Sequence, residues 1–416
     1  MAAKPTLRQS LRTLTGGLPR SFWALWAGTF VNRCGSFVLP FLTLYLTRAR
    51  HLSLSQAGLI VALYGAGVSV AGPLGGFLAD RVGRRATMLV ALGVGGAGMM
   101  SIGFVQRLGV LAPALFCVAA VTEMYRPAMQ ATLADMVPPA DRVRAYGLIY
   151  WVINLGFSVG LTLGGLLARV SFRWLFVGDG ATTLLFALVI WLAVPETRPA
   201  RAPVPAGERA PSQWSEFLAP YRDGSFALLL GLSFLFALVF MQNSSTFPLA
   251  MAANGIGTAT FGVILALNGV LIVLLQPFLA PVVSRRNRSY TLAASTVLVG
   301  LGFGLNALAH TAPLYALGVI VWTMGEIGVL PVSSALVADV APPHVRGRYQ
   351  GAYGLSFGLA VCAAPALGTL VLQRFGAVTL WSGCLLLSLA IAAGHLALAP
   401  ALTRLRALRI GVAATH

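Results

Sequence analysis

The sequence predicts an all-α integral membrane protein, with twelve transmembrane helices in two pseudo-symmetric six-helix halves around a central cavity. Three observations predict this class. Of the 416 residues, 57% are hydrophobic and only 10% are charged. Long apolar runs follow one another along the chain, and the second half repeats part of the first. Because a soluble domain carries about 25% charged residues, lipid must be the solvent for most of this chain.

The apolar runs predict helices. About 20 mostly apolar residues are needed to cross the hydrocarbon layer as a helix, and only helices or closed barrels satisfy every backbone group there. In chain order, the predicted spans are 21–47, 55–79, 86–106, 110–136, 142–168, 172–194, 225–251, 257–283, 289–309, 312–340, 346–372 and 376–400. The first run is too long for the core of a signal peptide, so we expect it to be retained as a span.

One long polar segment interrupts the spans. Residues 195–223 are rich in Pro, Ala and Arg, a composition typical of a linker. We therefore divide the chain into an N-terminal six-helix half (1–194), a cytoplasmic linker (195–223) and a C-terminal six-helix half (224–416).

The two halves carry a repeat. Residues 134–139 (ADMVPP) resemble residues 338–343 (ADVAPP), and the match continues over two arginines and a glycine at a constant offset of 204 residues. Six spans is an even number, so both halves cross the membrane in the same direction. Parallel repeats of this kind build transporters that rock about a central site.

The basic residues set the orientation. The net charge is +18, but the arginines and lysines fall in short groups between apolar runs and form no phosphate-binding stripe. With the N-terminus inside, 21 of them lie in cytoplasmic segments and 6 in outer segments. Cytoplasmic loops carry such an excess. We expect a multi-pass protein of the inner (plasma) membrane with both termini cytoplasmic, and no nucleic-acid partner.

The sequence offers no catalytic or metal-binding set. Each of the four cysteines lies inside an apolar run, and the five histidines are scattered. We therefore expect no metal, no cofactor and no enzyme activity. The expected partners are a small-molecule substrate, protons and membrane lipids, and we expect a monomer.

The loop between spans 2 and 3 carries a family resemblance. Its sequence, GFLADRVGRR at residues 76–85, resembles the signature loop of the major facilitator superfamily. The resemblance implies alternating access, with this loop latching the cytoplasmic side in one conformation. The expected latch residues are Gly76, Asp80, Arg81, Gly83, Arg84, Arg85, Asp135 and Arg144. The second half has Pro281 and Ser284 in place of Asp80 and Gly83, so we expect an asymmetric latch. Asp135 and Asp339 end spans 4 and 10 and are expected to pair with loop arginines.

The glycines of span 5 extend the resemblance to one branch of the superfamily. They are spaced similarly to those of the drug/proton antiporter (multidrug efflux) branch, although Leu161 stands where that motif has proline. The resemblance implies proton-coupled export of a small amphipathic or cationic compound. An alternative is a proton-coupled symporter of a zwitterion such as a short peptide, because residues 32–37 are loosely similar to peptide transporters. A channel or receptor is a further alternative, which the duplicated halves disfavour.

Ionisable residues inside spans point to function, because each costs roughly 2.5–3.5 kcal/mol at mid-bilayer. The candidates for proton coupling are Glu123, which we favour, Glu326 and Asp179. In the superfamily, spans 1, 4, 7 and 10 line the cavity, and this implies a set of substrate contacts. The expected cavity residues are Arg33, Asn32, Arg126, Tyr125, Asn154, Gln242, Asn243 and Trp322. The pair of Glu123 and Arg126, three residues apart, also fits a purely structural role.

Overall fold

The structure is a computed structural model that describes residues 16–52, 54–198, 217–284 and 286–414. Most of the linker therefore lies outside the described residues. Every regular element in the described part is helical.

The first half contains six spans. Span 1 is α2 (Arg20–Cys34), α3 (Val38–Leu44) and the π-helical turn η1 (Tyr45–Ala49). Spans 2 and 3 are α4 (Leu54–Arg81) and α5 (Arg84–Ile102), and span 4 is α6 (Leu108–Thr122) with α7 (Tyr125–Met136). Spans 5 and 6 are α8 (Arg142–Val170) and α9 (Arg173–Ala193).

The second half repeats this order after the short α11 (Ala219–Arg222). Span 7 is α12 (Gly224–Phe240), η2 (Met241–Asn243) and α13 (Phe247–Ala253). Spans 8 to 10 are α14 (Thr258–Ser284), α15 (Arg288–Gly304) with η3 (Leu305–Ala307), and α16 (Ala312–Val340). After η4 (Pro343–Val345), α17 (Arg346–Ala414) holds spans 11 and 12, divided at Gly376, where φ is 83°.

The twelve predicted spans are confirmed as helical segments. Ten described segments are long and apolar enough to cross a membrane. The one that runs from Pro343 to Leu408 contains two spans. Span 1 is not among the ten because residues 35–37 divide it into two short helical segments. Span 4 is also broken, between α6 and α7 at Glu123 and Met124, and span 7 is broken around η2.

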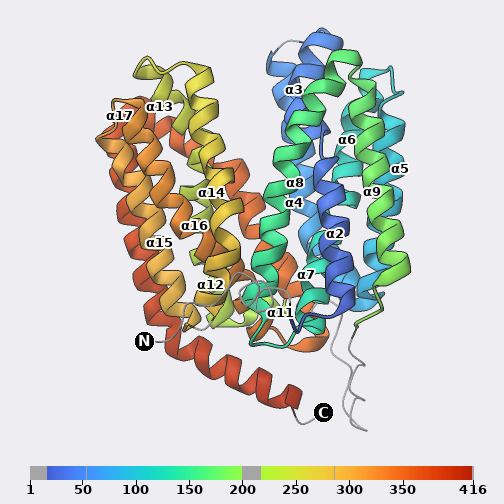
Figure 1. Cartoon of the computed structure of the whole chain (residues 1–416), viewed down its shortest axis with the longest axis vertical. Helices are drawn as coiled ribbons and strands as arrows, with labels where there is room; N and C mark the ends of the chain where they lie inside the picture. The colour runs from blue at the N-terminus through green and yellow to red at the C-terminus, as the bar shows by residue number, and fades with distance from the viewer. Residues whose placement is uncertain (1–15, 53, 199–216, 285, 415–416) are drawn as a thin grey trace.

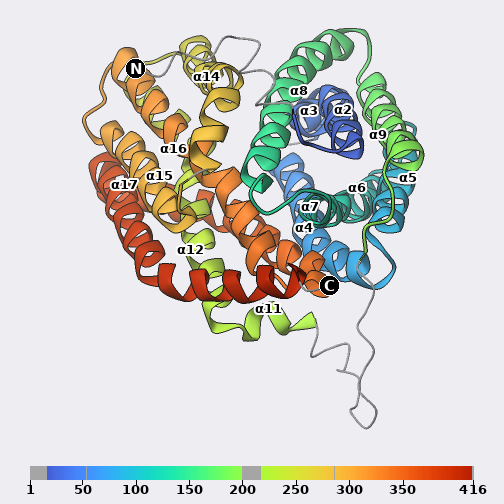
Figure 2. The ribbon, with the colours of Figure 1, turned by 60° about the horizontal axis from the view of Figure 1, so that its bottom comes forward.

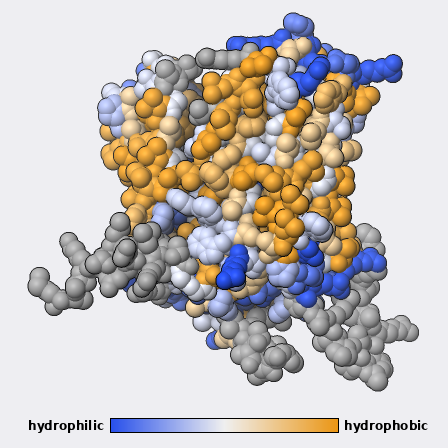
Figure 3. Space-filling model, turned by 45° about the vertical axis from the view of Figure 1, so that its right-hand side comes forward, coloured by the Kyte–Doolittle hydropathy of each residue, from blue (hydrophilic) through white to orange (hydrophobic). Residues whose placement is uncertain are grey.

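The two halves lie side by side (Figure 1) and come together at the lower end of the view, near α7 and α11. The helices that meet are α4 with α17, and α8 with α14 and α16. Seen from below, the last segment of α17 runs across this end of the molecule (Figure 2). The face of the molecule drawn in Figure 3 carries a broad apolar band with hydrophilic residues toward both ends, as a bilayer requires.

Glycine allows α4 and α17 to approach closely. A side-chain carbon on Gly76 would lie 2.3 Å from the carbonyl oxygen of Gly347, and one on Gly351 would lie 2.4 Å from that of Gly72. No other residue fits at such positions without displacing backbone. This contact places the end of α4 against the start of α17, where the polar site described next is built.

Candidate functional site

Asp80 joins the two halves at the lower end. Its carboxylate accepts hydrogen bonds from the backbone N–H groups of Gly347 and Arg348, both at 2.9 Å. These N–H groups belong to the first turn of α17, which favours a negative charge. Arg84 lies 3.6 Å from the carboxylate on one side, and the Asp80 side chain is only 1% exposed.

Two further carboxylates cross-link the halves through arginines. Asp339 of α16 pairs with Arg142 of α8 at 2.6 Å, and Asp135 of α7 pairs with Arg346 of α17. The prediction that Asp135 and Asp339 pair with arginines is confirmed. All four side chains are at most 8% exposed. A buried charge is tolerated only when it is paired, so pulling the halves apart here must expose these charges or leave them unpaired.

Each of these two carboxylates also pairs with an arginine of its own half. Arg84 lies 2.5 Å from Asp135, and Arg288 lies 2.5 Å from Asp339. Each of these arginines also donates across the seam to a backbone carbonyl oxygen: Arg84 to Pro343 at 3.0 Å and Arg288 to Pro139 at 2.7 Å. Each of these ion pairs and carbonyl contacts thus has a partner contact 204 residues away in the other half.

The expected asymmetry is therefore correct only in part. The ion pairs and carbonyl contacts are reciprocal, because the loop arginine is preserved as Arg84 and Arg288 even though the surrounding motif is not. Two contacts lack a counterpart among the described residues. Asp80 caps α17 on one side, and Arg406 from the end of α17 lies 2.8 Å from Asp339 on the other. We call this whole set of contacts the seam cluster; its members are Asp80, Arg84, Asp135, Pro139, Arg142, Arg288, Asp339, Pro343, Arg346, Gly347, Arg348 and Arg406.

Apart from Gly76, which meets α17, the other predicted latch residues make the following contacts within the first half. Gly83 has a φ of 127°, which only glycine adopts readily, and this turn starts α5. Glu196 then accepts from the backbone N–H groups of Arg84 and Arg85 at 2.9 and 3.1 Å. The Arg81 guanidinium lies 5.8 Å from the Phe77 ring. Arg144 donates to Gly16 and pairs with Asp141, also within the first half.

A second polar group lies higher in the first half. Arg33 donates to the Tyr125 hydroxyl at 2.6 Å, and Glu123, at the break in span 4, forms an ion pair with Arg126. The Arg126 side chain is 50% exposed and that of Glu123 is 13% exposed. The more exposed side chain of this ion pair is thus the guanidinium of Arg126.

Asn32 and Asp179 make contacts inside the first half. The Asp179 carboxylate accepts from the backbone N–H of Val38 at 3.1 Å, where α3 begins. The Asn32 amide donates to Thr183 of α9 at 3.0 Å, and Asn32 is 6% exposed. Both therefore hold the broken first span against span 6.

Glu326 is a buried acid at the seam, 3% exposed. One of its oxygens accepts from the hydroxyl of Tyr150 on α8, in the opposite half. The other accepts from Asn268 of α14 at 2.7 Å, and Asn268 also contacts Thr323. Among the described residues, no cationic side chain forms an ion pair with Glu326. It differs in this from Glu123, whose partner is Arg126.

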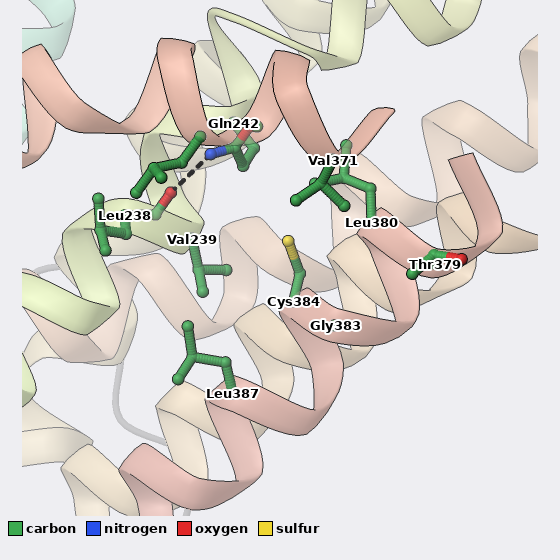
Figure 4. Close-up of a pocket in the computed structure, with 11 residues that line it drawn as sticks. Leu238, Val239, Gln242, Val371, Thr379, Leu380, Gly383, Cys384 and Leu387 are labelled. Carbon is green, nitrogen blue, oxygen red and sulfur yellow. Dashed lines mark hydrogen bonds between the residues drawn. The ribbon is translucent and has the colours of Figure 1, made fainter. Parts of the chain in front are cut away.

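The remaining expected cavity residues have different surroundings, and Asn243 is the last residue of η2, next to Gln242. Asn154 donates to the Tyr150 carbonyl oxygen at 2.9 Å, so it lies close to the seam. Trp322 is 1% exposed and stacks on Phe303, inside the second half. Gln242 donates to Ala364 of α17 and lines an apolar cavity of about 200 Å³ between α12 and α17 (Figure 4).

Known proteins share this architecture. A model of the Major Facilitator Superfamily matches residues 25–365 and 238–410. The chain is 29% identical over 363 residues to the uncharacterized MFS-type transporter YqjV of Bacillus subtilis, covering 85% of this chain and 87% of that protein. It is 23% identical over 365 residues to a Na⁺, Li⁺, K⁺/H⁺ antiporter of Planococcus maritimus, covering 81% and 85%. The structure of the human organic anion transporter MFSD10 superimposes with a TM-score of 0.73 at 18% identity, over 90% of this chain and 99% of that one.

Proposed function

Because the chain belongs to the Major Facilitator Superfamily, we propose that this transporter exports a small amphipathic or cationic compound in exchange for protons, by alternating access. Proton exchange is supported by the antiporter among its relatives and by the glycine spacing of α8. The seam cluster supports alternating access, since its reciprocal contacts form a closed end that opening must break.

We place the seam cluster on the cytoplasmic side. The 21-to-6 distribution of basic residues supports this orientation, and it makes the closed end the inner one. In this orientation the arrangement of the two halves corresponds to an outward-open state, and both termini lie in the cytoplasm.

We propose Glu326 as the principal proton carrier, in preference to Glu123 and Asp179. The observation that carries this choice is that, in the described part of the chain, only neutral groups bind the Glu326 carboxyl, and they come from both halves at once. Protonation of Glu326 therefore breaks no ion pair. Protonation of Glu123 would sacrifice its pair with Arg126, and Asp179 is occupied in capping α3.

A second candidate function is proton-coupled uptake of a zwitterion. The half-exposed guanidinium of Arg126 favours it, because a guanidinium binds a carboxylate well. In this second candidate function, Glu326 would bind the amine of the zwitterion. Arg126 remains available for such a ligand only if Glu123 gives up its ion pair.

Transport in proteoliposomes with an imposed pH gradient tests both candidates. Rhodamine 123 and ethidium represent cationic amphipathic exports, and dialanine represents a zwitterion. We expect dye movement against the proton flux, with the Glu326→Gln variant losing pH-driven transport while it still binds dye. Asp141→Asn is the matched acid-to-amide control. Dialanine uptake together with protons, without dye movement, would establish the second candidate instead. Full pH-driven transport by Glu326→Gln would show that another acid carries the proton.

A further inference from the structure

We infer that the hydroxyl of Tyr150 couples the protonation of Glu326 to the opening of the cytoplasmic seam. This inference rests on the proposed function, and it assigns a positioning role to a residue that the sequence did not single out. Tyr150 belongs to α8 of the first half and Glu326 to α16 of the second. Their hydrogen bond therefore joins the proton-binding group directly to the opposite half.

The hydrogen bond between Tyr150 and Glu326 lies within the contact between the two halves, which has to separate when the cytoplasmic end opens. On one side of Tyr150, a side-chain carbon on Gly147 would lie 3.0 Å from the Gln276 amide nitrogen. On the other side, the Trp151 indole N–H donates to the carbonyl oxygen of Val273 at 2.6 Å. Both partners are on α14 of the second half. Opening of the cytoplasmic end requires α8 to leave α14 and α16, so it breaks the bond between Tyr150 and Glu326.

The bond also lies at a different depth from the seam cluster. Glu326 precedes Asp339 by thirteen residues of the same continuous helix, or about 20 Å at 1.5 Å per residue. The arginine pairs thus close the cytoplasmic surface, and the Tyr150 contact closes the seam near the middle of the membrane. A group that couples the protonation of Glu326 to the separation of the two halves has to lie at this depth.

The direction of the coupling follows from hydrogen-bond strength. A phenol O–H that donates to an ionised carboxylate makes a bond roughly twice as strong as one to a neutral acceptor. When Glu326 takes a proton from the outer water, the bond from Tyr150 weakens, and the closed seam loses part of its stabilisation. The seam opens, Tyr150 withdraws, and Glu326 can release the proton to the cytoplasm.

Few groups compete with this coupling. Among the described residues, Asn268 from α14 is the other side chain that hydrogen-bonds to Glu326; it also donates to Thr323, and both are neutral. Tyr150 is the titratable side chain that contacts Glu326 among the described residues. In the opposite half, a change of charge on Glu326 therefore acts directly on the Tyr150 hydroxyl.

The test compares Tyr150→Phe with Tyr146→Phe in the full-length protein in lipid nanodiscs. Tyr146 lies one turn away on the same helix, but its hydroxyl donates to the Gln130 carbonyl oxygen of its own half at 2.7 Å. Spin labels at Val82→Cys and Tyr290→Cys, in a background without native cysteines, report the distance between the cytoplasmic ends of the two halves. Both positions are well exposed, at 57% and 63%. We call these labels the cytoplasmic pair.

In the wild-type protein, we expect lower pH to raise the fraction of molecules with a long distance between the cytoplasmic pair. Tyr150→Phe should raise that fraction about tenfold to a hundredfold at high pH, the value expected when a hydrogen bond to a charged group is lost, and should flatten the pH response. Glu326→Gln should do the same, and the double variant should add little. Tyr146→Phe should keep the wild-type pH response.

A second variant covers a failure of Tyr150→Phe to fold. Glu326→Asp retains a carboxyl group but withdraws it by one methylene from the Tyr150 hydroxyl, so it should bind the proton without passing the effect to the seam. A normal pH response in Tyr150→Phe or Glu326→Asp, together with its loss in Glu326→Gln, would overturn the role of Tyr150 and leave the proposed transport function intact. A normal response in Glu326→Gln would overturn Glu326 as the proton carrier as well.

Discussion

Replacing Asp80 by asparagine should shift the protein toward a state in which the end that holds the seam cluster is open. The carboxylate accepts from two backbone N–H groups of α17, both at 2.9 Å, and its side chain is 1% exposed. The asparagine amide has a single acceptor oxygen, so one N–H loses its partner and the other bonds to a neutral group. Both N–H groups belong to the opposite half, so the loss falls on the closed state alone.

The magnitude follows from these two bonds. A hydrogen bond to a charged group contributes about 1.5–3 kcal/mol and a neutral one about 1 kcal/mol. The loss of one charged bond and the weakening of the other should cost the closed state about 3 kcal/mol. Since 1.4 kcal/mol is a factor of ten, the ratio of closed to open molecules should fall about a hundredfold. Transport should slow because the return to the closed state becomes limiting.

The cytoplasmic pair of spin labels measures this ratio in nanodiscs, beside transport assays on protein with normal yield and gel-filtration behaviour. Asp141→Asn is the matched control. Its carboxylate pairs with Arg144 of the same half at 3.3 Å and is 38% exposed, so it should leave the distances unchanged. If folded Asp80→Asn gave the wild-type distance distribution and transport rate, the cap on α17 would not hold the halves together.

Three further outcomes are expected. Gly76→Ala should also favour the open state, because its new carbon would lie 2.3 Å from a backbone oxygen of α17 and overpacking costs about 1–3 kcal/mol. The control is Gly93→Ala, whose new carbon meets nothing within 4 Å and should leave the distance between the cytoplasmic pair unchanged. Equal distances in the two variants would contradict this account of the packing. Arg346→Gln should lengthen the distance in the same assay, since it removes an ion pair between the halves, and an unchanged distance would argue against a latch. In a cysteine-free background, an impermeant thiol reagent should label His51→Cys but not Ser212→Cys from outside intact cells, and labelling of Ser212→Cys would reverse the orientation.

The repeat in the sequence predicts more of the seam than the signature loop does. Composition and run length were enough for the twelve spans, since lipid permits few alternatives. The offset of 204 residues relates Arg142 to Arg346 and Asp135 to Asp339. Across the halves, Arg142 pairs with Asp339 and Arg346 pairs with Asp135. Sequence alone could not show that each arginine binds the carboxylate of the other half, because that exchange depends on how the halves face each other.

Local breaks and long-range contacts were not predictable from the sequence. Glu123 and Arg126 have the spacing of neighbours on a continuous helix, yet the helix is broken at Glu123. Glu196 lies in the predicted linker, more than 100 residues from the turn that starts α5, yet its carboxylate caps that helix. The bond between Tyr150 and Glu326 joins residues 176 positions apart, and it depends on the rotation of two helices in different halves.

The reciprocal contacts of Arg84 and Arg288 make the closed end an isologous interface, of the kind found in two-fold symmetric dimers. Each half presents a carboxylate, two arginines and a proline carbonyl oxygen, and it receives the same groups from its partner. The surface of either half is thus self-complementary in these groups. Two copies of the second half, expressed without the first, would carry everything needed to form the arginine pairs with each other but would lack the cap that Asp80 provides. The covalent joining of two unlike halves is what lets a single aspartate act on one side of an otherwise symmetric gate.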